Sequence, residues 1–163
     1  MRKVLQFSGG KDSLACLYMY KDDPDVVVAY ASSGSPIPHT PEFVRRTTKA
    51  LGMKLYETQP SIPACEWQDK NGATIIIRGS RRSDPNCGAV DGLVENGLTY
   101  LSPIWEWSDD DVFSYLKGMG AEIPSQYDQG GDSLDCWCCT AYMSRHGAVR
   151  YAYMKEWFPE LHD

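Results

Sequence analysis

The sequence lacks the features that would assign it to several specialised classes of protein. No run of apolar residues approaches the roughly 18 that a membrane span needs. Basic residues are not in excess, since 16 Lys and Arg face 22 Asp and Glu. That balance argues against broad, non-specific binding to nucleic acid, although it leaves room for a local basic site. Repeats, low-complexity tracts and linkers are also missing, so the 163 residues predict one domain over residues 1–163.

The first residues lead directly into an apolar run, which leaves no place for a signal peptide. We therefore expect a cytoplasmic protein. In that compartment the six cysteines should be thiols, metal ligands or redox groups rather than structural disulfides.

Short apolar runs alternate with amphipathic segments along the chain. Strands are expected at Val4–Phe7, Val26–Tyr30, Lys54–Glu57, Thr74–Arg78 and Thr99–Leu101. Helices are expected at Leu14–Tyr20, from Thr40 to before Gly52, from Ser108 past Met119, and from about Thr140 to Trp157. Several strands are continuously apolar, as in a parallel sheet covered on both faces. The pattern predicts an α/β fold: one doubly wound, mostly parallel five-stranded sheet with helices on both faces.

The segment Ser8-Gly9-Gly10-Lys11-Asp12-Ser13, here called the glycine loop, joins the first expected strand to the first expected helix. Glycines let the backbone approach a phosphate, and the first N–H groups of a helix point at it. Lysine adds a positive charge and the serines add hydroxyl donors. The spacing is not that of a Walker A loop, so transfer of a γ-phosphate is not indicated. The loop predicts an anion site; a turn without a ligand is the plainer alternative.

Residues Arg78-Gly79-Ser80-Arg81-Arg82, here called the arginine segment, follow the fourth expected strand. Guanidinium groups bind phosphate or sulfate through paired hydrogen bonds, so the segment predicts an anion site. A cluster of solvated charges without a ligand is the alternative. Because carboxyl ends of parallel strands meet at one edge, we expect this segment to approach the glycine loop. The aspartates Asp109, Asp110 and Asp111 after Ser108 could mark a metal site, but we interpret them as capping a helix.

Cys136 and Cys139 form a C-x-x-C pair with Cys138 between them. Zinc sites, iron–sulfur clusters and redox dithiols all use that spacing. Cys65, and less readily Cys87, would supply a further ligand. The hypothesis is a zinc ion or 4Fe–4S cluster held by Cys65, Cys136, Cys138 and Cys139; buried, unliganded thiols are the alternative. The aromatic residues Tyr151, Tyr153, Trp157 and Phe158 fit either a core face or a partner or homodimer surface.

Four blocks in this order resemble the phosphoadenosine phosphosulfate (PAPS) reductase-like branch of the adenine-nucleotide α-hydrolase-like superfamily, whose pyrophosphate loop reads S-G-G-x-D-S. They are the glycine loop, the stretch from Ser32-Ser33-Gly34 to Glu42-Phe43, the arginine segment, and Pro103–Trp107 with Asp111–Leu116. The segment Tyr127–Thr140 is similar to the family's closing loop, which ends C-x-x-C-T. The resemblance covers nearly the whole chain.

The resemblance implies a small adenine-nucleotide ligand, either ATP or a sulfonucleotide (PAPS or APS), together with Mg²⁺. The phosphates would be held by Ser8, Gly9, Gly10, Lys11, Asp12 and Ser13. Tyr30 and Ala31 would present backbone to adenine, with Gly34 in the following loop. Arg78, Gly79, Arg81 and Arg82 would line the site for the phosphosulfate or the β- and γ-phosphates. Lys11, Asp12 and Arg81 would be catalytic, with Asp12 approaching the metal.

Departures from the family pattern leave the reaction open. Ser32-Ser33-Gly34 stands where relatives often carry Asp-Thr-Gly, and Ala64-Cys65 stands where iron–sulfur relatives carry a tandem Cys pair. No cysteine follows Cys139, whereas reductases carry a nucleophilic cysteine in a carboxyl-terminal tail. Three hypotheses remain: an enzyme acting at the α-phosphate of ATP, a compact reductase whose thiol comes from the C-x-x-C group or a partner, and a non-catalytic nucleotide-binding subunit of a nucleic-acid-modifying or sulfur-transfer complex.

Overall fold

The computed structural model describes residues 2–32, 36–58, 72–84, 90–128 and 143–161. Its strands are β1 (Arg2–Gln6), β2 (Val26–Ala31), β3 (Leu55–Thr58), β4 (Ala73–Ile77), β5 (Val94–Glu95) and β6 (Leu98–Leu101). Its α-helices are α1 (Lys11–Met19), α2 (Thr40–Ala50), α4 (Asp109–Gly118) and α5 (Met143–Trp157), and the short 3₁₀ helices are η1 (Ser125–Tyr127) and η2 (Pro159–Leu161).

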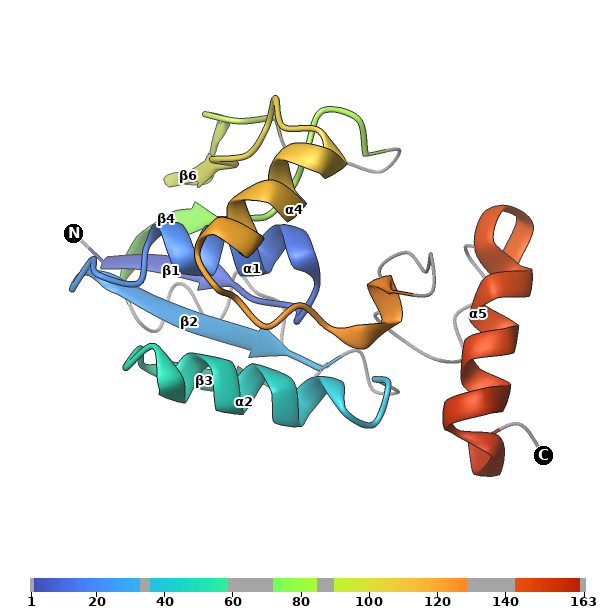
Figure 1. Cartoon of the computed structure of the whole chain (residues 1–163). Helices are drawn as coiled ribbons and strands as arrows, with labels where there is room; N and C mark the ends of the chain where they lie inside the picture. The colour runs from blue at the N-terminus through green and yellow to red at the C-terminus, as the bar shows by residue number, and fades with distance from the viewer. Residues whose placement is uncertain (1, 33–35, 59–71, 85–89, 129–142, 162–163) are drawn as a thin grey trace.

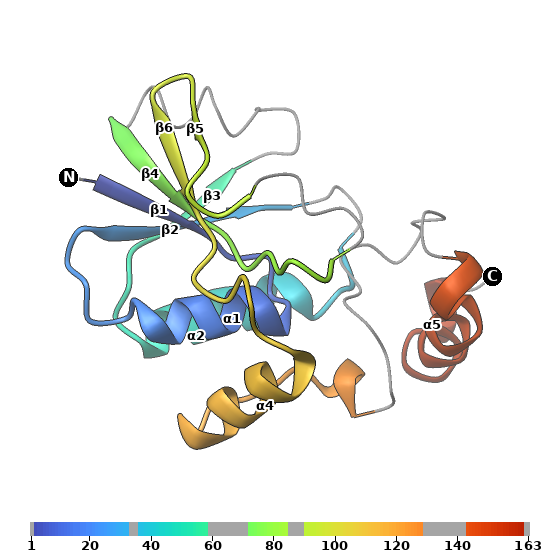
Figure 2. The ribbon, with the colours of Figure 1, turned by 90° about the horizontal axis from the view of Figure 1, so that it is seen from above.

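The strands form one sheet in the order β3-β2-β1-β4-β6-β5. Figure 1 labels all of them except β5, which is labelled in Figure 2. All neighbouring pairs are parallel except β5 and β6. The predicted α/β class and mostly parallel sheet are confirmed, with six strands in place of the five predicted. The additional strand β5 forms because Asn96 and Gly97, both at positive φ, make a two-residue turn that folds the chain back onto β6.

The order of the strands places the loops after β1 and β4 next to each other. From β1 the chain proceeds outward through β2 to β3, and β4 then lies on the opposite side of β1. At such a reversal, the connections that follow the two neighbouring strands lead to strands on opposite sides. Ligands of open α/β sheets bind between these connections, outside the carboxyl ends of the strands. The glycine loop follows β1 and the arginine segment follows β4, so both lie at this reversal.

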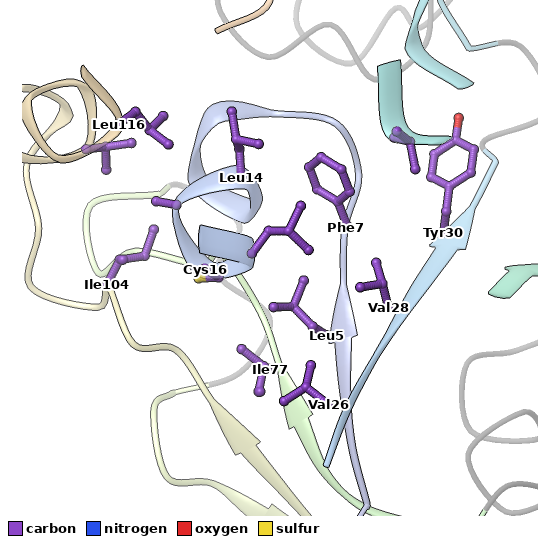
Figure 3. Close-up of a cluster of buried hydrophobic side chains, with 14 of the residues drawn as sticks. Leu5, Phe7, Leu14, Cys16, Val26, Val28, Tyr30, Ile77, Ile104 and Leu116 are labelled. Atoms are coloured by element: carbon purple, nitrogen blue, oxygen red, sulfur yellow. The ribbon is translucent and has the colours of Figure 1, made fainter. Parts of the chain in front are cut away.

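The helix α1 is fixed from two sides. Figure 2 shows α1 and α2 on one side of the sheet, with α4 beyond α1. Fully buried side chains of β1, β4 and α1, among them Leu5, Ile77 and Leu14, form the core beneath it (Figure 3). On its outer side, Val112 and Leu116 of α4 belong to the same cluster. This packing leaves α1 little freedom to move, so the position of its amino-terminal end is well defined.

Beyond the carboxyl end of the sheet lies α5 (Figures 1 and 2). Tyr153 is buried with Ile37, and Phe158 packs against the same cluster. Tyr151 and Trp157, in contrast, are each 53% exposed. The four aromatic residues therefore divide between core and surface, and a partner surface at the exposed pair stays a prediction. None of the helices in the described ranges combines the length and the apolar character that crossing a membrane requires.

A complete capping box begins α4. The Ser108 hydroxyl accepts a hydrogen bond from the backbone N–H of Asp111, and the Asp111 carboxylate accepts one from the backbone N–H of Ser108. The prediction that these residues cap a helix is confirmed, because two N–H groups without intrahelical partners are satisfied reciprocally.

We predict that Ser108→Ala lowers the free energy of unfolding by about 0.5–2 kcal/mol, because an N–H group at the start of α4 loses its acceptor. Urea unfolding followed by circular dichroism would measure the change. Ser114→Ala, at an exposed position within the same helix, is the matched control and should be neutral or slightly stabilising. Equal effects of the two substitutions would contradict a capping role.

Candidate functional site

The bend of the glycine loop requires glycine at position 9. Gly9 has φ +89, a left-handed conformation that side chains rarely adopt. A β-carbon on this residue would also lie 2.8 Å from Thr40 Cγ2 and 3.3 Å from Val44 Cγ2. The loop therefore packs against the first turns of α2, and both the backbone conformation and the available space exclude a larger residue.

The two serines of the loop tie it to itself. The Ser13 hydroxyl donates to the Gly10 carbonyl oxygen at 3.0 Å and lies 3.1 Å from the Ser8 hydroxyl. The Ser8 hydroxyl in turn accepts from the Gly10 N–H at 3.3 Å. Ser13 is buried and Ser8 is exposed. Ser13 thus maintains the shape of the loop, while Ser8 is the hydroxyl that a ligand from solvent would meet.

A distant tyrosine reaches the amino-terminal end of α1. The N-cap residue, Gly10, has no side chain to cap the helix, and the backbone N–H of Lys11 donates to the Tyr127 hydroxyl at 3.0 Å. The phenol oxygen therefore satisfies one of the N–H groups that lack intrahelical partners. The sequence indicated Tyr127 only as the start of the segment similar to the family's closing loop. Its contact with α1 was not predicted, because 116 positions separate it from Lys11.

Gly79 of the arginine segment lies directly against the start of α1. A β-carbon at Gly79 would be 2.4 Å from Ser13 N and 2.5 Å from the carbonyl carbon of Asp12. Such distances are far below van der Waals contact, so only glycine fits. The structure brings the two predicted segments together through their backbones, while their roles in ligand binding stay predictions.

Two buried cations lie at this contact. The side chains of Lys11 and Arg81 are 5% and 9% exposed. Lys11 Nζ lies 2.8 Å from Asp12 Oδ2 and 2.8 Å from Asp109 Oδ1. Arg81 Nη1 lies 2.9 Å from that same Asp109 oxygen. The ammonium group is also flanked by the rings of Phe113 and Tyr127, at 5.9 and 5.8 Å from their centroids.

Asp84 completes this set of charges. Its Oδ2 accepts the backbone N–H of Arg81 at 2.7 Å, and its Oδ1 lies 3.3 Å from Arg81 Nη2. We call the set the carboxylate network; its members are Lys11, Arg81, Asp12, Asp84 and Asp109. With all five groups charged, two cations and three anions give a formal charge of −1. The interpretation of Asp109 as a capping residue alone was therefore incomplete.

Burial and charge act in opposite directions within the network. Burial raises the pKa of Asp12, while the charges of Lys11 and Arg81 oppose that shift. Burial would also raise the pKa of Asp109, but its contacts with Lys11 and Arg81 outweigh burial and lower it. Asp12 Oδ1 and Arg81 Nε are 3.2 Å apart, yet neither buried atom makes a well-aligned hydrogen bond. Their hydrogen-bonding capacity is thus incompletely used.

The other predicted ligand residues lie in different surroundings. Arg78 Nε donates to Gln6 Oε1 at 2.9 Å, and its guanidinium lies 4.8 Å from the Tyr100 ring centroid. Arg82 is exposed and reaches Glu106 at 3.4 Å. At the carboxyl end of β2, Tyr30 is buried and Ala31 is exposed. The remaining predicted residues, Gly34, Cys65, Cys87, Cys136, Cys138 and Cys139, lie outside the described residues.

The described residues do not form a metal site. Within the described ranges, no group of three or more His, Cys, Asp or Glu side chains is placed to hold a metal ion. Both carboxylate oxygens of Asp12 face cations, Oδ2 toward Lys11 and Oδ1 toward Arg81. A Mg²⁺ ion would have to replace those cations, so Asp12 in this arrangement does not fit the predicted role of metal ligand.

Cys16 of α1 is a buried thiol within the core. Its sulfur donates to the Arg78 carbonyl oxygen at 3.5 Å, and burial raises its pKa to about 12. At neutral pH this cysteine is protonated and shielded from solvent, which makes it unsuitable as a nucleophile.

The chain is similar to known proteins in sequence and in fold. Residues 62–142 match the family model for the phosphoadenosine phosphosulfate reductase domain. The chain is 26% identical to an uncharacterized protein of Methanocaldococcus jannaschii, over 95% of this chain and 44% of that protein. It is also 26% identical to the phosphoadenosine 5'-phosphosulfate reductase of Alkalilimnicola ehrlichii, over 71% of this chain and 60% of that protein. The chain therefore spans less than two thirds of the length of each of these relatives.

Two solved structures illustrate the likeness in fold. One is the PAPS reductase of Candida auris in complex with phosphate, with a TM-score of 0.73 and 17% identity over 86% of this chain and 84% of that one. The other is the FMN adenylyltransferase of Candida glabrata in complex with ATP, with a TM-score of 0.67 and 17% identity over 79% of this chain and 50% of that one. At these identities the comparison shows the shared fold and does not assign an activity.

We predict that Gly79→Ala destabilises the protein by about 1–3 kcal/mol or more, because the added methyl group meets backbone rather than a movable side chain. Urea unfolding would measure the loss. Gly118→Ala is the matched control, since a β-carbon there has no neighbour within 4 Å. That residue ends α4, so alanine should be neutral or slightly stabilising. A Gly79→Ala protein as stable as the wild type would contradict the backbone contact between the two segments.

Proposed function

Since this chain belongs to the phosphoadenosine phosphosulfate reductase-like family, we propose that it is an enzyme that binds an adenine nucleotide through the phosphates at the glycine loop. The reaction that we propose is attack on the α-phosphorus of ATP with release of pyrophosphate. The nucleotide would bind where the glycine loop and the arginine segment meet.

One observation supports this proposal above the others. The Lys11 ammonium and the Arg81 guanidinium both contact a single oxygen of Asp109, at 2.8 and 2.9 Å. Both cations are therefore directed at one point beside the amino-terminal end of α1. An oxygen of a phosphate group at that point would meet the same two charges, close to the N–H groups of the first helical turn.

The proposed reaction develops negative charge on the leaving pyrophosphate, beside Lys11 and Arg81. An acceptor oxygen forms a bond to the α-phosphorus and loses its proton to solvent. The bond from the α-phosphorus to the bridging oxygen of the β-phosphate breaks, and its electron pair leaves with pyrophosphate. Lys11 and Arg81 would stabilise the charge that develops on the leaving group. Asp12 would act as a positioning residue that holds both cations toward the loop.

The cysteine of the described core does not supply the thiol that reduction would need. Sulfonucleotide reduction needs a thiolate that attacks sulfur, forms an S–S bond and releases the nucleotide. Cys16 is buried, with a pKa raised to about 12, so it does not supply that thiolate. Attack at the α-phosphorus requires no thiol from the protein.

Reduction of a sulfonucleotide is the second candidate function. It is favoured by the family match over residues 62–142, because this stretch contains all the cysteines of the chain except Cys16. A thiol from that stretch or from a partner protein would attack the sulfur, and a second thiol would then release sulfite. Binding of a nucleotide without either reaction would instead favour the role of a nucleotide-binding subunit.

We predict that the protein binds ATP and that Lys11→Gln weakens this binding by about 10- to 100-fold, because a charge-assisted contact contributes roughly 1.5–3 kcal/mol. Isothermal titration calorimetry with and without Mg²⁺ would measure the affinity. Lys49→Gln, an exposed lysine on α2, serves as the matched control. In parallel, pyrophosphate release from ATP and thiol-dependent sulfite release from PAPS and APS would distinguish the two reactions. A wild-type protein without affinity for any of the three nucleotides would contradict the proposal.

A further inference from the structure

We infer that Asp109 is an exchangeable carboxylate that occupies Lys11 and Arg81 in the nucleotide-free protein, and that the nucleotide's phosphate must displace it in order to bind. This inference rests on the proposed function and concerns the regulation of the same site. It assigns to the first residue of α4 a role that its local sequence, a run of aspartates after a serine, does not indicate.

The contacts of Asp109 place one of its oxygens where an anion would bind. Its Oδ1 atom lies 2.8 Å from Lys11 Nζ and 2.9 Å from Arg81 Nη1. Both donors belong to the two segments predicted to bind phosphate, and both side chains are buried. A carboxylate oxygen and a phosphate oxygen accept the same hydrogen bonds from such groups. The two anions therefore compete for one position.

The charges of the network indicate that the exchange is needed. With Asp109 in place, Lys11 and Arg81 face three carboxylates and the formal charge is −1. Adding a polyphosphate to this arrangement would bring further negative charge next to Asp109 in a partly buried place, where repulsion is weakly screened. Once Asp109 has left, two cations face two carboxylates, so a phosphate meets a neutral set of charges.

Among the three carboxylates, Asp109 is the one that can leave. Its side chain is 61% exposed, compared with 19% for Asp12 and 33% for Asp84. Asp84 is further held by the backbone N–H of Arg81. Rotation of the Asp109 side chain into water thus breaks little packing and restores the hydration of the carboxylate.

The departure of Asp109 would leave its helix intact. The beginning of α4 is capped by Ser108 and Asp111, independently of Asp109. The buried residues Val112 and Leu116 hold the helix in the core shared with α1. The exchange therefore needs a side-chain rotation and no movement of α4.

The exchange has a consequence for the choice of ligand. A monovalent anion that replaced Asp109 would exchange one negative charge for another and gain little. A pyrophosphate or triphosphate group carries several charges and many acceptor oxygens, so it can contact Lys11, Arg81 and the exposed Ser8 hydroxyl together. Asp109 would lower the affinity for simple anions and for polyphosphates by the same factor, so a polyphosphate would still bind through its additional contacts where a simple anion would bind only weakly.

The test compares Asp109→Asn with Asp110→Asn. Both substitutions remove one negative charge from the first turn of α4. Of the two residues, only Asp109 contacts Lys11 and Arg81 in the described part of the structure. Calorimetric titration with inorganic pyrophosphate and with ATP, in metal-free buffer, should show Asp109→Asn binding about three- to tenfold more tightly than wild type. Asp110→Asn should remain within about twofold of wild type, because screening weakens the effect of an exposed charge. Asp109→Ser provides a second variant with the same expected direction.

The outcomes separate this inference from the proposed function. If wild type binds pyrophosphate and ATP but both Asp109 variants bind no more tightly, or more weakly, the inference is wrong while nucleotide binding stands. An equal gain in Asp109→Asn and Asp110→Asn would also overturn it, since only net charge would then matter. If neither wild type nor the variants bind any adenine nucleotide or pyrophosphate, both the inference and the proposed function fail.

Discussion

The backbone contact between Gly79 and the first turn of α1 is the constraint on which the candidate site depends. A β-carbon at Gly79 would lie 2.4 Å from Ser13 N, so the loops after β1 and β4 approach as closely as two backbones can. The order of the strands makes this approach possible, because β1 and β4 are neighbours at the reversal of the sheet. The core beneath α1 then keeps the contact in place, and it is this contact that brings Arg81 to the side of Lys11.

Burying two cations at one point is costly unless carboxylates compensate them, and the structure supplies these from three parts of the chain. Asp12 comes from the glycine loop, Asp84 follows the arginine segment, and Asp109 begins α4. The first two are the more buried and hold the cations in position. The third is largely exposed and joins both cations through one oxygen. Two fixed carboxylates, Asp12 and Asp84, and one exchangeable carboxylate, Asp109, are suited to a site that binds an anion reversibly.

Much of the fold could be predicted from local sequence. Glycines between an apolar run and an amphipathic run indicated the loop at Gly9, and continuous apolar runs indicated the parallel strands. The strand β5 was missed although Asn96-Gly97 is a strong hairpin signal, because Val94–Glu95 is too short to show alternation. The contacts of Asp109 and Tyr127 with Lys11 depend on how α4 and η1 pack against α1, and no local pattern encodes that packing. Capping was the correct interpretation of Asp111. For Asp109 it was incomplete, because the contacts of Asp109 depend on the packing of α4 against α1.

We propose that the glycine loop, together with Gly79, surrounds the phosphates of an adenine nucleotide. The most direct measurement is a titration of ¹⁵N-labelled protein with a non-hydrolysable ATP analogue, followed by amide chemical shifts. We expect the largest shifts on the amides of residues 8–13 and of Gly79, and pyrophosphate alone should reproduce them. Saturable binding with unchanged amides in both segments, and shifts concentrated elsewhere in the chain, would contradict it.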